Sequence, residues 1–244
     1  MNRFSALLVL ILTVCFALSP LASDGFNGFT RDQFPVVQAF WPVQPAGWAF
    51  SIWGLIYLWL IAGAGFGLWQ RAQAPDWQAM RPALIVSLLI GTFWIAAANY
   101  SPLLATAMIL VMWAAAVAAW LRAGHQDALW QLRPLGLYAG WLTAASGVAA
   151  GAVLSGYGIL SAQAAALVCL SLVGLAGLML QQRRPQEWAY PAAIIWALIG
   201  VIAANLPREN WPVIALAALG IALLVWRGLA AQKPESRAIY TAGR

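Results

Sequence analysis

Residues 44–69 contain the apolar segment that most limits what this chain can fold into. The segment opens with Gln-Pro-Ala-Gly and then stays apolar to Trp69, and a helix of about 20 such residues crosses a bilayer. Seven other apolar runs have a similar character. They cover residues 1–21, 82–98, 103–121, 135–154, 159–180, 188–206 and 211–226. The sequence therefore predicts an all-α fold, a polytopic membrane helix bundle of about eight transmembrane helices.

The composition and the placement of charge agree with a membrane protein. The chain is 63% hydrophobic and 8% charged, whereas soluble domains are about a quarter charged. The net charge of +6 does not indicate nucleic acid, because the basic residues stand between apolar runs. With a cytoplasmic N-terminus, the outer loops hold only Arg31 and Arg208 of the 13 Lys and Arg residues. The positive-inside rule then places both termini in the cytoplasm, and we expect a bacterial inner membrane.

Two segments near the N-terminus leave alternatives open. Residues 1–21 are either a retained first helix or a cleaved signal peptide, and Pro20 disfavours a cut after Ala22. Residues 22–46 form a long loop that contains four prolines or glycines before Pro45 and five aromatic side chains. A solvated linker is usually polar. We therefore expect this loop to fold back on lipid or on the mouth of the bundle.

Chemically reactive side chains are absent from the predicted spans. Apart from Arg3 at the start of the first run, no Asp, Glu, Lys, Arg or His lies inside them, and the single histidine, His125, lies in a predicted loop. Cys15 and Cys169 lie in apolar runs as small hydrophobic residues. Proton-coupled transport and Schiff-base or haem chemistry normally need ionisable groups at depth. We expect no enzyme activity, no metal site and no covalent cofactor.

An aromatic face and several glycine steps remain as candidate functional features. Phe50, Trp53 and Tyr57 share one helical face by their spacing. Interfacial anchoring is the simpler explanation for Trp48 and Trp69, but it fits the deeper rings less well. Small residues at 63/67, 136/140 and 147/151 predict close helix packing on the second and fifth helices.

Two motifs carry a resemblance to a known family. The pattern Pro45-x-Gly47-Trp48-x-Phe50-x-x-Trp53-x-x-x-Tyr57 resembles the second helix of the TspO/MBR family, the tryptophan-rich sensory and translocator proteins. Pro134-x-x-x-Tyr138-x-x-Trp141 resembles the start of its fifth helix. The resemblance implies a cavity among the first five helices, covered by loop 22–46, for a flat apolar ligand such as a porphyrin (a tetrapyrrole) or a sterol-like molecule. Trp94 and Asn99 are implied only by their position on the third helix, and the other ligand-binding residues by motif match. The implied ligand-binding residues are Trp48, Phe50, Trp53, Tyr57, Trp94, Asn99, Tyr138 and Trp141.

The resemblance also implies a division of the chain. Residues 1–155 correspond to the five-helix part, residues 156–228 to three additional transmembrane helices, and residues 229–244 to a polar cytoplasmic tail. The triplet Ala-Ala-Asn at 97–99 and at 203–205 suggests that two four-helix halves repeat. Two other functions stay open: a facilitator or exporter of a neutral small molecule, and a ligand-free membrane assembly partner. Membrane lipid and an apolar ligand are the expected partners, and a homodimer stays open.

Overall fold

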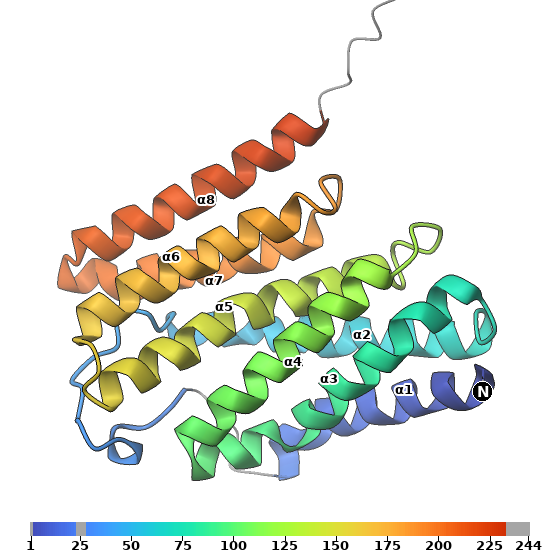
Figure 1. Cartoon of the computed structure of the whole chain (residues 1–244), viewed down its shortest axis with the longest axis horizontal. Helices are drawn as coiled ribbons and strands as arrows, with labels where there is room; N and C mark the ends of the chain where they lie inside the picture. Colours follow the sequence, from blue (N-terminus) through green and yellow to red (C-terminus); the bar gives the residue numbers. More distant parts are fainter. Residues whose placement is uncertain (1, 23–27, 233–244) are drawn as a thin grey trace, which may run out of the picture.

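The computed structural model describes residues 2–22 and 28–232, and within these ranges it contains helices and no strands. The long helices are α1 (Asn2–Leu18), α2 (Ile52–Trp69), α3 (Pro75–Tyr100), α4 (Pro102–Arg122), α5 (Leu132–Gly156), α6 (Ala162–Gln181), α7 (Ala189–Asn205) and α8 (Trp211–Gln232) (Figure 1). Four short 3-10 helices join them: η1 (Ser19–Ala22), η2 (Arg31–Gln33), η3 (Gly47–Ser51) and η4 (Leu206–Arg208). Within the described part of the chain, eight helices are long and apolar enough to span a membrane. The predicted all-α bundle is confirmed.

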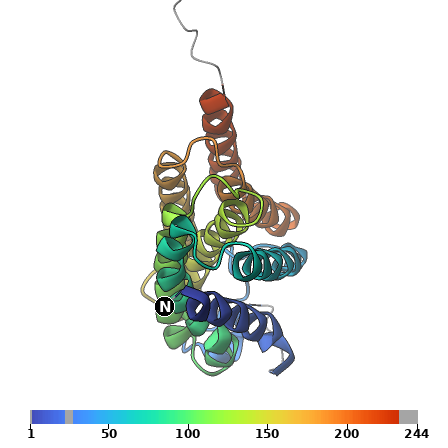
Figure 2. The same cartoon turned by 90° about the vertical axis from the view of Figure 1, so that its right-hand side faces the viewer.

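Helix α5 lies at the centre of the bundle, and α8 lies at one edge (Figures 1 and 2). Helices α4, α6 and α7 pack against α5, while α1 packs against α2 and α3. The glycines of α5 permit this closeness. A Cβ atom at Gly140 would lie 2.1 Å from the carbonyl oxygen of Tyr190 on α7, and one at Gly147 would lie 2.3 Å from Val173 on α6. The close packing predicted for these glycine steps is therefore present.

Helix α3 begins earlier than its sequence pattern predicted. The span was expected at residues 82–98, but α3 starts at Pro75 and contains Pro82 in its interior. Pro75 occupies the first helical turn, where a missing amide proton costs nothing. The following residues Trp77 and Arg81 are buried at 2% exposure each, so packing extends the helix through the polar stretch. Helix α3 therefore contains two ionisable residues, Asp76 and Arg81, so the expectation of a span without such residues is wrong for this helix.

The C-terminal boundary also differs from the sequence prediction. Residues 229–232, which were expected to begin the tail, belong to α8. Residues 233–244 lie outside the described residues, as do residues 23–27 of the expected covering loop.

The outer loop is bound to the ends of three helices. Its described part, residues 28–46, buries the side chains of Phe29, Phe34 and Trp41. Backbone and side-chain hydrogen bonds fix it in place. They are Gln33 Nε2 to Ala98 O (2.8 Å) on α3, Val36 N to Gly156 O (2.9 Å) on α5, Ala46 N to Gly200 O (2.9 Å) on α7, and Asn205 Nδ2 to Pro42 O (2.8 Å). The loop therefore folds back over the bundle.

Candidate functional site

Two cavities meet at the end of the bundle that carries the loop at residues 28–46, and they share a wall of aromatic side chains. Phe50 from η3, Trp53 from α2 and Trp94 from α3 line both of them. The chain reaches this position because η3 starts at Gly47 and runs directly into α2 at Ile52. The three rings therefore separate a space under the loop from a space at the bundle surface.

The surface space, here called the outer crevice, is the larger of the two. It has a volume of about 400 Å³ and lies between the end of α1, the η3–α2 junction and α3. Its lining residues are Phe16, Pro20, Gly47, Trp48, Phe50, Ser51, Trp53, Tyr57, Trp94 and Ile95. No charged residue is among them, so its chemistry is aromatic and weakly polar.

The space under the loop, here called the inner cavity, is small. It has a volume of about 40 Å³. Besides the shared rings, its lining residues are Gly28, Phe29, Gln44, Pro45, Ile109, Trp141, Ala144, Ala145, Val148, Ala149 and Ala197. Aromatic rings border this small space, among them those of Phe29 and Trp141. Besides residues of the first five helices, the lining includes Ala197 of α7.

The shared wall is held by ring contacts from three helices. Trp53 and Tyr57 stack with centroids 5.2 Å apart and planes at 19°. Phe16 meets these two rings edge-on, at 5.6 Å and 5.1 Å, and Trp141 meets Phe50 and Trp53 edge-on at 5.9 Å and 6.1 Å. Both arrangements are favourable for aromatic pairs. The wall therefore has flat ring faces in fixed orientations.

Of the eight site residues implied by the sequence resemblance, six line a cavity and two do not. Trp48, Phe50, Trp53, Tyr57, Trp94 and Trp141 each line at least one of the two cavities.

Tyr138 and Asn99 line neither of these two cavities. Tyr138 is fully buried, and its hydroxyl lies 2.8 Å from the Ser87 hydroxyl. It supports the wall from behind, with its ring 6.4 Å from that of Trp53. Asn99 lies exposed at the end of α3. Its backbone carbonyl accepts a hydrogen bond from Gln33, at 3.2 Å.

Sequence reasoning missed Phe16, Phe29 and Ala197. Phe16 sits in an apolar run where nothing distinguishes it from its neighbours, so no sequence signal identifies it. The aromatic content of the outer loop did indicate that its rings face the bundle, but it did not single out Phe29.

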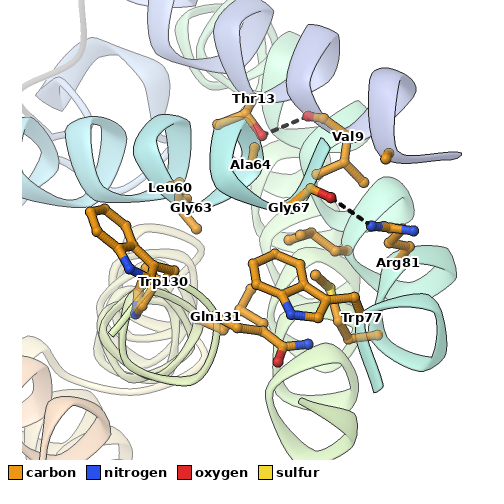
Figure 3. A pocket seen from close by; sticks show the side chains of 15 residues that line it. Val9, Thr13, Leu60, Gly63, Ala64, Gly67, Trp77, Arg81, Trp130 and Gln131 are labelled. Carbon is orange, nitrogen blue, oxygen red and sulfur yellow. Dashed lines mark hydrogen bonds between the residues drawn. The ribbon is translucent and has the colours of Figure 1, made fainter. Parts of the chain in front are cut away.

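The inner half of the same α1–α2–α3 seam is nearly closed (Figure 3). Its cavity measures about 20 Å³, enough for about one water molecule. The polar groups around it bond to protein: the Thr13 hydroxyl donates to Val9 O at 2.7 Å, and Arg81 donates to Gly67 O at 3.2 Å. The ring of Trp77 fills the space beside Gly67. This half of the seam is closely packed.

Comparison with known proteins identifies the family. A family model described as TSPO-like protein matches residues 2–230. The match continues through α6, α7 and into α8, beyond residues 1–155 on which the two motifs rest. No curated protein and no solved structure matches the chain. The chain belongs to the family of TSPO-like proteins, and it is a multi-pass membrane protein.

Proposed function

We propose that this protein binds a flat, apolar small molecule, such as a porphyrin or a sterol-like molecule, in the outer crevice. The observation that carries the proposal is the crevice of about 400 Å³ lined by Trp48, Trp53, Tyr57 and Trp94. Small-molecule sites are mostly apolar clefts of about 300–1,000 Å³ with few polar groups. The inner cavity of about 40 Å³ is too small for such a ligand unless the shared wall moves.

The chemistry of the lining favours a planar ligand. Indole and phenol rings bind planar molecules by offset or edge-on contacts of about 0.5–1.5 kcal/mol each beyond burial. The hydroxyls of Ser51 and Tyr57 and the half-exposed indole of Trp48 are the polar groups available to orient it. No charged side chain lines the crevice, so a charged substituent would have to project out of it.

The closed inner half of the seam supports binding over passage through the bundle. The same three helices that border the crevice leave only about 20 Å³ in their inner half, beside Trp77 and Arg81. A facilitator or exporter would have to open this packing in every cycle. Counterflow of a neutral solute in proteoliposomes would favour that second function.

The distribution of Lys and Arg residues supports a position of the crevice on the outer side of the membrane. If the N-terminus is cytoplasmic, the loop that carries Arg31 and the crevice lie at the outer side of a bacterial inner membrane. Reporter fusions at Gly124 and after Arg244 should then both report the cytoplasm. A periplasmic signal at Gly124 would place the crevice on the other side of the membrane. A periplasmic signal at Arg244 would change the number of membrane-spanning helices.

A paired glycine substitution tests the proposed site. Gly47 lines the crevice and Gly54 lies exposed on α2, and a Cβ at either position would meet nothing within 4 Å. Gly47→Leu should fill the crevice and lower porphyrin affinity at least tenfold, as measured by saturable tryptophan quenching in detergent. Gly54→Leu is the matched control and should leave the affinity unchanged. Quenching that does not saturate, or an unchanged affinity in Gly47→Leu, would reject the crevice as the site.

A further inference from the structure

A basic pocket lies at the opposite end of the bundle from the crevice. It has a volume of about 290 Å³ and is formed by the α4–α5 and α6–α7 connections with the first turn of α5. Its lining residues are His125, Ala128, Leu132, Arg133, Arg183, Arg184, Pro185, Gln186, Glu187 and Trp188. Three arginines and a histidine therefore surround one space, against a single carboxylate.

Arg184 gives this pocket a fixed shape. Its Nη2 donates to the carbonyl oxygens of Leu121 and Ala123, both at 2.7 Å, and its Nη1 lies 3.2 Å from Nε2 of His125. These bonds satisfy the last carbonyls of α4, which have no partner within the helix. The two connections are thus joined across the pocket by one guanidinium, and burial lowers the pKa of Arg184.

The single carboxylate of the pocket is used elsewhere. Glu187 is 6% exposed and accepts hydrogen bonds from the backbone N–H groups of Ala189 (2.8 Å) and Tyr190 (3.0 Å) at the start of α7. Burial raises the pKa of Glu187, although these two bonds and the nearby charge of Arg133 oppose the shift. The carboxylate of Glu187 therefore interacts with the first turn of α7, and the arginines of the pocket keep an excess of positive charge.

Two arginines remain available to a ligand. Arg183 is exposed, and its guanidinium makes no hydrogen bond to any residue that the structure describes. Arg133 lies with its guanidinium carbon 5.8 Å from the ring centroid of Trp188. Trp188 is 49% exposed and lies 6.4 Å from Trp59, also by centroids. Exposed tryptophans at the ends of membrane helices mark the level of lipid headgroups.

We propose that this pocket binds the phosphate group of an anionic molecule, with Arg133 and Arg183 as the groups that contact it. Guanidinium groups bind phosphate oxygens through paired, charge-assisted hydrogen bonds, and basic pockets between membrane helices suit anionic headgroups. The position beside Trp188 favours a membrane phospholipid as the source. A soluble phosphate compound has the same chemistry, so the test separates the two sources.

The test measures lipid binding to the detergent-solubilised full chain by native mass spectrometry. Phosphatidylglycerol is titrated against phosphatidylcholine, and inorganic phosphate is added in a separate arm. We expect preferential binding of phosphatidylglycerol, weakened about fivefold by Arg133→Gln and about fivefold by Arg183→Gln. Arg184 is left unchanged because it holds α4 in place.

Arg122→Gln is the matched control. Arg122 is exposed at the same end of the bundle, and its guanidinium donates to Ala118 O within its own helix, so its loss should not change lipid binding. If inorganic phosphate binds and the Arg133 and Arg183 variants weaken it, while the two lipids bind equally, the ligand is a soluble phosphate. If the Arg133 and Arg183 variants bind both phosphatidylglycerol and inorganic phosphate as the wild-type protein does, the proposal is wrong.

Discussion

The two halves of the α1–α2–α3 seam differ in what fills them. In the outer half, Trp48, Phe50, Trp53 and Tyr57 leave a crevice of about 400 Å³. In the inner half, the same helices leave about 20 Å³. Rigid ring systems at helical spacing keep the outer helix ends apart, whereas small residues let a neighbour fill the inner half. The sizes of the side chains along η3 and α2 thus match an open outer half and a filled inner half.

The inner half is also held by polar contacts that the crevice lacks. Arg71 and Asp127 form a salt bridge of 2.8 Å, and the indole N–H of Trp77 donates to the same carboxylate at 2.9 Å. Arg81 donates to three carbonyls, those of Gly67, Arg71 and Ala72. Substitutions in the inner half should therefore change stability, and substitutions in the outer half should change binding.

The largest effect is expected at Gly67. A Cβ there would lie 2.3 Å from the Trp77 ring, so Gly67→Val forces the inner half apart. Overpacking of this kind costs about 1–3 kcal/mol, and we expect about 3 kcal/mol in reversible unfolding. Gly65→Val is the control, since a Cβ at Gly65 meets nothing within 4 Å. Equal stability of the two variants would mean that the glycine–tryptophan contact does not close the seam.

The next effect is expected at Arg81. Arg81→Gln removes donors from the carbonyls at the end of α2 and leaves them buried without partners. Each buried unsatisfied group costs about 1–3 kcal/mol, and we expect a loss of about 2 kcal/mol in the free energy of unfolding. Porphyrin affinity of the folded fraction should not change. A reduced affinity at full stability would show that the inner half takes part in binding.

The smallest effect is expected in the outer loop. Gln33→Ala removes the hydrogen bonds to Ala98 O and Asn99 O, worth about 1 kcal/mol net. Trypsin should cut at Arg31 slowly in the wild-type protein and about fivefold faster in the variant. Rapid cutting at Arg31 in the wild-type protein would contradict a loop bound to the bundle.

The sequence predicted what depends on repeated, local patterns. Apolar run lengths gave eight spans, and the spacing of Phe50, Trp53 and Tyr57 gave a shared face, because helical periodicity is fixed. It did not predict the burial of Arg81, because a charged residue next to a proline is typical of a loop. Only the carbonyls at the end of α2 explain why it is buried.

Side-chain packing limited the prediction of the site itself. The Ala-Ala-Asn triplets suggested similar roles, yet Asn205 is buried and donates to Pro42 O and Val201 O, whereas Asn99 is exposed. The volume under the loop depends on how Phe29 and Trp141 fill it, and no sequence pattern specifies that. The contribution of Phe16 is likewise a tertiary contact.

Porphyrin affinity of Trp53→Ala tests the central claim most directly, namely that the aromatic end of α2 forms the wall of a binding site. Trp53 contacts both cavities, so its loss removes a stacking surface. We predict at least a tenfold loss of affinity, about 1.4 kcal/mol, with the melting temperature little changed. Trp69→Ala is the control, because Trp69 is 87% exposed at the other end of α2, and it should bind normally. A Trp53→Ala protein that is destabilised but binds porphyrin like the wild-type protein would show that Trp53 is core packing and would contradict the account.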